Sequence, residues 1–218
     1  MDAPQHQHPL IMPLGDRGLL VRFGDALSEP ANRAAIAFGQ RAMAASLPGV
    51  EEVVPNLVSV LLRYTPGKVD FDRLAGEVRL LLSSPGTIAG EQREHRLPVT
   101  FDGGDLPEVA ALLGMDVGAF VSAHCAAELR VLATGFAPGF VYCGFHAESL
   151  RVPRRAEVRP RVPAGTVLFA AGQTALASTA IPTGWHVIGH TLVRNFDPQA
   201  MPPTRLAAGD KVRFEVAA

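Results

Sequence analysis

Over the first hundred residues, short continuous apolar runs alternate with segments in which apolar residues recur at helical spacing. The run RGLLVRF at 17–23 predicts a strand, and Pro30 stands where a helix commonly begins. The helix that follows carries apolar side chains at helical spacing, namely Ala35, Ile36, Phe38 and Met43. We expect it to stop before the Pro-Gly pair at 48–49, because proline and glycine interrupt helices.

Two further strands and a second helix come next. The runs at 50–54 and 59–64 predict strands on either side of a Pro-Asn turn. Asp70 is placed to cap a helix that runs to about Leu82 with one apolar face. A further β-type run follows at 93–101.

These elements follow the order β-α-β-β-α-β, which is typical of a ferredoxin-like domain. We therefore assign residues 15–92 to an N-terminal ferredoxin-like α/β domain that serves as a scaffold. Residues 1–14 are polar and contain prolines, and we expect a disordered or loosely held tail there. Residues 93–218 are assigned to a C-terminal domain.

The C-terminal domain has a different pattern. After a turn that contains Asp102 and Asp105, apolar runs at 106–114 and 117–124 predict two connecting helices. We expect both aspartates to act as caps or turn residues, and Asp116 to cap the second helix. Short β-rich runs then alternate with glycine and proline: LRVLAT, FVYCGF, TVLFAAG, TALAST, HVIGHTLVRNF and KVRFEV. Many short strands predict a barrel or a sandwich, so the fold class is α+β.

Composition and charge exclude several classes of protein. The formal net charge is −1, so no basic field points to nucleic acid or to an anionic membrane. Only Lys68 and Lys211 are lysines, which leaves few candidates for Schiff-base chemistry. Two cysteines do not make a disulfide framework, and we expect two reduced thiols. With no signal-peptide pattern and no apolar run of about 20 residues, we expect a cytoplasmic protein.

Arginines are concentrated in one extended segment. Five fall between positions 151 and 161, opposed there only by Glu157: Arg151, Arg154, Arg155, Arg159 and Arg161. Like charges at this density repel one another unless anions lie among them. The segment is either a solvated loop or a site where planar guanidinium groups bind a carboxylate or phosphate.

Other candidates for a binding site flank this segment. Gln173 and Thr174 place an amide and a hydroxyl beside a strand, and Trp185 either walls a pocket or fills the core. A tight loop at a barrel mouth is predicted by the glycines and aromatic side chain of the run Gly135, Phe136, Ala137, Pro138 and Gly139.

The histidines do not form a recognisable metal motif. His186 and His190 are expected in one strand, where positions i and i+4 lie about 13 Å apart, too far for one ion. His124 and Cys125 are neighbours on a helix and therefore point apart, so their adjacency does not pair a nucleophile with a base. We expect no metal site.

Several ordered motifs together resemble a known family. They are GFAPGFVY at 135–142, PRRAEVRPRVPAGTV at 153–167, the Gln-Thr pair at 173–174, GWHVIGHT at 184–191 and GDKVRF at 209–214. The upstream run at 98–110 and His124 fit the same pattern. The chain thus resembles the allophanate hydrolase subunit 1 family, also called the KipI family, over about residues 15–215. That family includes the B subunit of bacterial 5-oxoprolinase.

The resemblance implies a function and its parts. It implies a cyclophilin-like β-barrel after the α/β domain, and the B-type subunit of an ATP-dependent amide or lactam hydrolase acting on 5-oxoproline. The implied cofactor is ATP, with or without Mg²⁺, shared with partner subunits. The implied partners are a subunit-2 (C-type) cyclophilin-like protein and a LamB/YcsF-type A subunit, with no nucleic acid and no membrane. Two alternatives are a KipI-like inhibitor of a sensor histidine kinase and a carboxyltransferase component of urea carboxylase.

The resemblance also suggests roles for residues. We expect Arg154 and Arg161 to bind an anion, with Gln173, Thr174, Trp185 and His190 in the same substrate site, alongside the loop residues Gly135, Phe136, Pro138 and Gly139. His124 is either a proton-transfer group or a structural histidine.

This chain departs from the family pattern at a few positions. Thr183 stands where a glycine is usual, and His190 where an arginine is usual. The run from Cys143 to His146 replaces a usual Leu-Gly-Gly-Leu. We expect these changes to affect the ligand or the strength of anion binding.

Overall fold

A computed structural model describes residues 9–83 and 92–217. The chain separates into two compact units, with the division between residues 91 and 92. Each unit has its own apolar core. Within the described residues, no single helix is long and apolar enough to cross a membrane, and one pair passes that test only with a bend of 86°.

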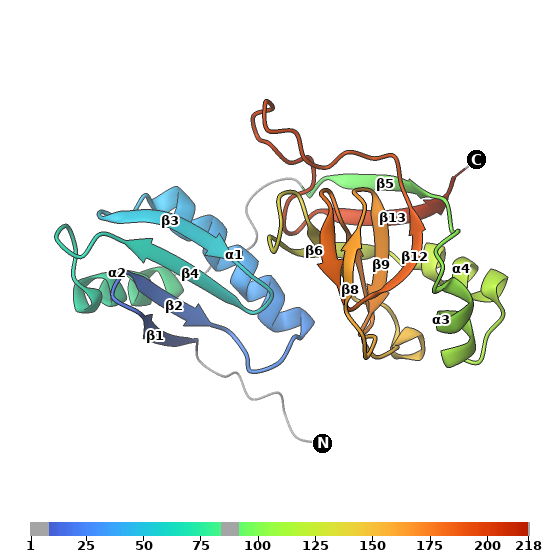
Figure 1. Cartoon of the computed structure of the whole chain (residues 1–218). Helices are drawn as coiled ribbons and strands as arrows, with labels where there is room; N and C mark the ends of the chain where they lie inside the picture. Colours follow the sequence, from blue (N-terminus) through green and yellow to red (C-terminus); the bar gives the residue numbers. More distant parts are fainter. Residues whose placement is uncertain (1–8, 84–91, 218) are drawn as a thin grey trace, which may run out of the picture. The chain divides into compact units, whose positions relative to one another are not determined.

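The first unit is a four-stranded antiparallel sheet with two helices on one face (Figure 1). Its elements are β1 (Leu10–Leu14), β2 (Gly18–Arg22), α1 (Glu29–Ala45), β3 (Val50–Pro55), β4 (Ser59–Tyr64) and α2 (Phe71–Ser83). The helices begin where the sequence provides caps. The Ser28 side chain accepts a hydrogen bond from the Ala31 amide at 3.4 Å, and the Asp70 side chain accepts one from the Arg73 amide at 2.8 Å.

Two expectations about this unit were wrong. Part of the tail assigned to residues 1–14 is strand β1, which pairs with β2 from Leu10 to Leu14; residues 1–8 lie outside the described part. The sheet order is β1-β2-β4-β3, so β1 takes the edge beside β2. A ferredoxin-like β-α-β-β-α-β unit would place its last strand there. The run at 93–101, which completed the predicted β-α-β-β-α-β pattern, is not part of this sheet. It forms β5 (Glu94–Val99) of the second unit, within the residues assigned to the C-terminal domain.

The second unit contains a seven-stranded sheet in the order β12-β9-β10-β7-β6-β13-β5. Beyond β5, its elements are α3 (Leu106–Leu112), α4 (Val117–Ala126), β6 (Leu129–Thr134), β7 (Val141–Gly144), the short 3₁₀ helix η1 (Glu148–Leu150), β8 (Arg159–Val162), β9 (Thr166–Ala170), β10 (Gln173–Leu176), β11 (Ile181–Thr183), β12 (His186–His190) and β13 (Lys211–Val216). Strands β8 and β11 form a separate two-stranded sheet.

The seven-stranded sheet curls until its two edges meet. Just beyond β5, Thr100 exchanges two backbone hydrogen bonds of 2.9 Å with His190 at the end of β12. All seven strands contribute side chains to one apolar cluster, which the helices join through Leu106 and Phe120. A cluster shared by every strand lies inside the curl, so we call it the interior. A second cluster, with Tyr142, Leu168 and Trp185, packs on the outer face.

The edge-to-edge contact requires a residue without a side chain. A Cβ added at Gly189 would lie 2.3 Å from the carbonyl oxygen of Thr100, which is a backbone atom and cannot turn aside. We expect Gly189→Ala to lower the free energy of unfolding by about 1–3 kcal/mol, the usual cost of overpacking. Urea titration followed by the emission of Trp185, the only tryptophan, measures this in the second unit.

Gly104→Ala is the matched control, because an added Cβ there meets nothing within 4 Å. It should change the stability by less than about 0.5 kcal/mol. Equal effects of the two substitutions would show that the contact between the sheet edges does not limit stability.

Candidate functional site

The residues predicted for one site lie on both faces of the curled sheet. Along β10, alternate side chains point to opposite faces. Thr174 shares the inward direction of Leu176, which belongs to the interior cluster. Arg154 and Trp185 are on the outer side. The structure therefore builds two groups of candidate residues rather than the single pocket that the sequence suggested.

A buried trio of polar side chains occupies the interior. The Nε2 atoms of His124 on α4 and His146 after β7 both lie 2.8 Å from the Thr174 hydroxyl oxygen. The two imidazole ring centres are 4.8 Å apart. His124 and Thr174 are fully buried, and His146 is 8% exposed. We call these three residues the His-Thr-His trio.

Apolar surroundings keep both imidazoles neutral. The ring of His124 is in contact with the rings of Phe101, Phe120 and Phe214. Burial, and after it the neighbouring His146 ring, hold the pKa of His124 well below its usual value. Burial lowers the pKa of His146 to about 4. Near neutral pH the trio therefore holds no charge.

The two thiols are poor nucleophiles. Burial raises the pKa of Cys143, on β7, to about 12. Burial, with a contribution from the charge of Glu215, also raises the pKa of Cys125. Because the thiolate is the reactive form, neither side chain is suited to nucleophilic catalysis at neutral pH.

A row of aromatic side chains runs along the outer face. Successive ring centres are 5.4 Å apart from Phe136 to Phe140, 4.8 Å from Phe140 to Tyr142 and 5.9 Å from Tyr142 to Trp185. The Arg154 guanidinium carbon lies 5.6 Å from the centre of the Trp185 ring, within the range of a cation–π contact. We call these five residues the aromatic row.

The row has two exposed ends. Phe136 is 68% exposed and holds a positive φ of 74°, while Arg154 is exposed at the other end. Burial raises the pKa of the Tyr142 phenol, and the charge of Arg154 acts in the opposite direction. The row therefore offers a ligand one exposed ring and one cation, with a half-buried phenol close to the cation.

Gly139 fixes the loop that carries Phe136. Its carbonyl oxygen accepts hydrogen bonds from the Ser178 hydroxyl at 2.6 Å and the Asn195 amide at 2.8 Å. Its φ is +68°, and an added Cβ would lie 2.5 Å from the Cβ of Phe196. The loop also closes on itself, because the Gly135 amide donates to the Phe140 carbonyl at 3.1 Å. Gly139 thus has a structural role, and Gly135 and Pro138 are exposed beside it.

Much of the arginine segment binds a carboxylate of the chain itself. Asp105 accepts a hydrogen bond from Arg155 Nη1 at 2.9 Å, from both Nη atoms of Arg159, and from the Val187 amide at 2.7 Å. Burial opposes ionisation of Asp105, yet the hydrogen bonds from Arg159 and Val187 hold its pKa below the ordinary value. Asp105 makes no side-chain cap to α3, so its expected role as a cap was wrong.

The remaining arginines differ in what they contact. Arg151 pairs with Glu148 at 3.2 Å. Arg154 and Arg161 are exposed, and within the described residues neither has a carboxylate partner. Of the five arginines, these two are therefore the ones that can bind an external anion.

Four other predicted or unusual polar residues are members of neither group. Gln173 is buried beside Thr174 on β10, with its side chain directed to the opposite face. His190 is exposed and its Nδ1 lies 2.8 Å from Asp102, whereas His186 Nε2 donates to the Pro153 carbonyl at 3.0 Å. The unusual Thr183 accepts a hydrogen bond from the Trp185 amide at 3.0 Å, which is a structural role.

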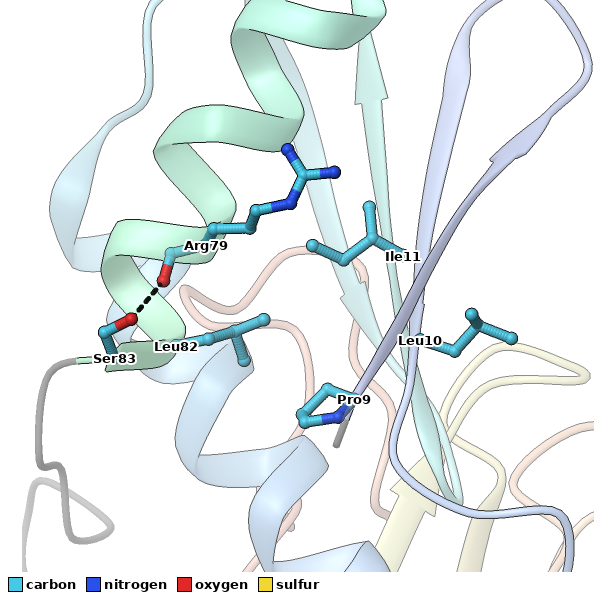
Figure 2. A pocket seen from close by; sticks show the side chains of 6 residues that line it. All are labelled: Pro9, Leu10, Ile11, Arg79, Leu82 and Ser83. Carbon is cyan, nitrogen blue, oxygen red and sulfur yellow. Dashed lines mark hydrogen bonds between the residues drawn. The ribbon is translucent and has the colours of Figure 1, made fainter. Parts of the chain in front are cut away.

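The first unit carries an open hollow of its own, of about 720 Å³. It lies between β1 and the end of α2, and Figure 2 shows Arg79 extended across it toward Ile11. Its lining is mainly apolar, and the Ser83 hydroxyl donates to the Arg79 carbonyl. None of the residues predicted for the site lines this hollow.

Sequence reasoning missed three residues. In the sequence, His146 stands out only as a departure from the family pattern, and Asp105 only as a turn residue. Tyr142 is part of the motif GFAPGFVY, but nothing in the sequence gives a reason to assign it a role in binding. An unopposed arginine cluster signals that a carboxylate must lie near it, but only the fold shows which carboxylate is brought there.

Comparisons with known proteins place these features in context. Residues 9–206 match the family model described as "Carboxyltransferase domain, subdomain C and D". The 5-oxoprolinase B subunit of Bacillus subtilis (strain 168) is 32% identical over 218 residues, covering 92% of this chain and 90% of that protein. The 5-oxoprolinase B subunit of Escherichia coli O157:H7 is 39% identical over 173 residues, covering 77% of this chain and 78% of that protein.

Solved structures share the fold. The crystal structure of TTHA0988 is 40% identical with a TM-score of 0.84, over 93% of this chain. This chain spans only 40% of that longer chain. The urea amidolyase of K. lactis superposes with a TM-score of 0.75 at 15% identity, over 96% of this chain and 15% of that one. At that identity the likeness concerns the fold alone.

The ion pairs of Asp105 should contribute strongly to stability. Asp105→Asn removes the charge that two arginines share, and the side chain of Asp105 is 5% exposed. We expect the free energy of unfolding to fall by about 3 kcal/mol. This is the lower end of the range for breaking a buried ion pair, because both guanidinium groups keep some contact with water. Urea unfolding measures the loss. Glu108→Gln, which removes an exposed partner of Arg155, should cost less than about 1 kcal/mol.

The buried His146 should make stability depend on pH. Its folded pKa of about 4 lies below the unfolded value of 6.5, so the unfolded chain takes up a proton first as the pH falls. When the pH is lowered from 7.5 to 5.0, the free energy of unfolding of the wild type should therefore fall by about 2 kcal/mol more than that of His146→Leu. The figure follows from about 1.36 kcal/mol for each pH unit below 6.5. Urea titrations at both pH values test this, and equal losses would contradict it.

Proposed function

Because the chain belongs to the family of carboxyltransferase domains, subdomains C and D, which includes the 5-oxoprolinase B subunits, we propose that it is a subunit of a 5-oxoprolinase-type hydrolase complex. The proposed reaction is ATP-dependent opening of the lactam of 5-oxoproline to give glutamate. The 5-oxoprolinase B subunits of two bacteria match most of this chain and most of their own length, which supports this assignment.

The role that we propose for this subunit rests on Arg154, the exposed cation of the aromatic row. 5-Oxoproline is a small ring with a carboxylate. Arg154 has one face on Trp185 and lies near the Tyr142 phenol, and it has no carboxylate partner among the described residues. A planar guanidinium can bind a carboxylate through two parallel hydrogen bonds. We propose that Arg154, with Arg161, binds the anionic group of the substrate or of ATP.

The residues fit only part of an ATP site. Phosphates need cations and backbone amides. Arg154 and Arg161 provide cations, but two amides of the glycine loop are already used within it: Gly135 donates to Phe140, and Phe140 donates to Ala137 at 3.0 Å. We therefore propose that this chain contributes arginines to a nucleotide held mainly by partner subunits. When bound, ATP would supply the phosphoryl group that activates the amide oxygen.

The partners and the location remain proposals drawn from the family. We propose a subunit-2 protein and a LamB/YcsF-type A subunit as partners, and the cytoplasm as the location. We also infer that the curled sheet is a cyclophilin-like barrel. Binding of this chain to a sensor histidine kinase is the alternative that failure of the enzyme assay would favour.

Reconstitution tests the proposal directly. The purified chain, combined with the two proposed partner subunits, 5-oxoproline and ATP, should release glutamate in an amount that depends on all three proteins. Absence of glutamate, when the homologous protein of Escherichia coli restores it, would overturn the proposal.

Substitution of Arg154 tests the anion-binding role. Arg154→Gln should lower kcat/KM about 10- to 100-fold, because a hydrogen bond to a charged group contributes about 1.5–3 kcal/mol. Arg151→Gln is the matched control, since Arg151 is exposed in the same segment but pairs with Glu148. Equal kcat/KM for the Arg154 variant and the wild type would exclude the role while leaving the enzyme assignment intact.

A further inference from the structure

Two hydrogen bonds flank Arg154, the cation of the aromatic row. The Pro153 carbonyl oxygen, immediately before Arg154, accepts a hydrogen bond of 3.0 Å from His186 Nε2. The amide of the residue after Arg154 donates one of 2.8 Å to the Gly184 carbonyl. Gly184 and His186 are the two chain neighbours of Trp185, the ring that the Arg154 guanidinium lies over. The segment that carries the cation is therefore fastened on both sides to the segment that carries the ring.

The direction of the His186 hydrogen bond follows from its acceptor. A carbonyl oxygen can only accept, so Nε2 carries the hydrogen and donates it. The other ring nitrogen, Nδ1, has no hydrogen-bond partner among the described residues. It lies 4.0 Å from Glu108 Oε2, which is too long for a hydrogen bond. Within the described residues, the buried His186 ring is thus held by its hydrogen bond to Pro153.

This hydrogen bond controls the one backbone angle that proline leaves free. The pyrrolidine ring of Pro153 fixes φ, so the direction of its carbonyl depends on ψ. The same rotation turns the planar peptide group that leads into Arg154. Before Pro153, the Val152 carbonyl accepts a hydrogen bond of 2.7 Å from the Ala171 amide. That contact and the one at Gly184 join backbone to backbone, so His186 makes the side-chain contact among the three.

We propose that His186 is a positioning residue for Arg154. Its Nε2–H holds the peptide group between Pro153 and Arg154, and so keeps the guanidinium over Trp185 before a ligand arrives. The inference rests on the anion-binding role proposed above for Arg154. A long side chain loses rotational freedom when it binds a ligand, and a guanidinium already held on a ring loses less. His186 would therefore strengthen anion binding without touching the anion.

NMR of the full-length wild type tests the arrangement without any assay of activity. Nitrogen spectra of the chain labelled at histidine, assigned with His186→Gln, should show a hydrogen on Nε2 of His186. A bare Nε2 would overturn the proposal, because it could not donate to Pro153. The side-chain protons of Arg154, assigned with Arg154→Gln, should be shifted upfield by the ring current of Trp185.

Substitution of His186 tests whether its hydrogen bond holds the cation in place. His186→Met removes the donor, and the Arg154 signals should move toward those of a solvated arginine. His186→Gln keeps an N–H group at the end of the side chain and should preserve the upfield shift. His95→Met is the matched control, because it removes a histidine that is bonded to Asp210 elsewhere in the second unit. It should leave the Arg154 signals unchanged.

Two results would overturn the positioning role: unchanged Arg154 signals in His186→Met, or equal loss of the shift in His186→Met and His186→Gln. Should His186→Met fail to fold, the wild-type spectrum and the His186→Gln variant still decide. A bare Nε2 or a lost shift in His186→Gln contradicts the proposal, whereas a hydrogen on Nε2 and a retained shift support it.

A double-mutant cycle in the reconstituted complex separates positioning from a general effect on structure. His186→Met should lower kcat/KM about 2- to 10-fold, the equivalent of one ordinary hydrogen bond, and His186→Gln should restore most of it. In an Arg154→Gln background His186→Met should have no further effect, because it acts through Arg154. Equal losses in both backgrounds would overturn the positioning role. A complex with no activity at all would contradict the proposed function, while the NMR results would still decide the role of His186.

Discussion

The Asp105 carboxylate holds three separate segments of the second unit together. It binds Arg155 and Arg159 from the arginine segment and the Val187 amide from β12, while it stands at the start of α3. These contacts neutralise charges that would otherwise repel one another, and they fix the course of the chain from 155 to 159. Because Arg155 and Arg159 are held there, their neighbours Arg154 and Arg161 are left on the exposed side.

The interior and the outer face of the same sheet have different chemistry. The outer face carries aromatic rings and cations, which suits recognition of an anionic ring compound. The interior carries two neutral histidines around one hydroxyl, in surroundings that disfavour charge. Burial of polar side chains is costly unless they are hydrogen-bonded, and the Nδ1 atoms of His124 and His146 have no hydrogen-bond partner among the residues that the structure describes.

Local patterns in the sequence were sufficient for most elements. The two helices of the first unit and the cap at Asp116 were expected at the positions where they occur, because capping and helical spacing act over a few residues. The wrong assignments both concerned pairing between distant segments. β1 was not expected because its short apolar run becomes a strand only beside β2. β5 was counted as the last strand of the first unit's pattern, although its residues were assigned to the C-terminal domain, because its parallel partner β13 lies more than a hundred residues away.

The sequence by itself determined the α+β class, the family and the set of residue types from which a site can be built. It also showed an arginine segment whose like charges repel one another unless anions lie among them. Only the tertiary structure decided that Asp105 supplies that carboxylate, that Thr174 faces inward between two histidines, and that Arg154 lies on Trp185. The physical reason is that side-chain direction in a curled sheet depends on strand register, and register is set by contacts between residues far apart in the chain.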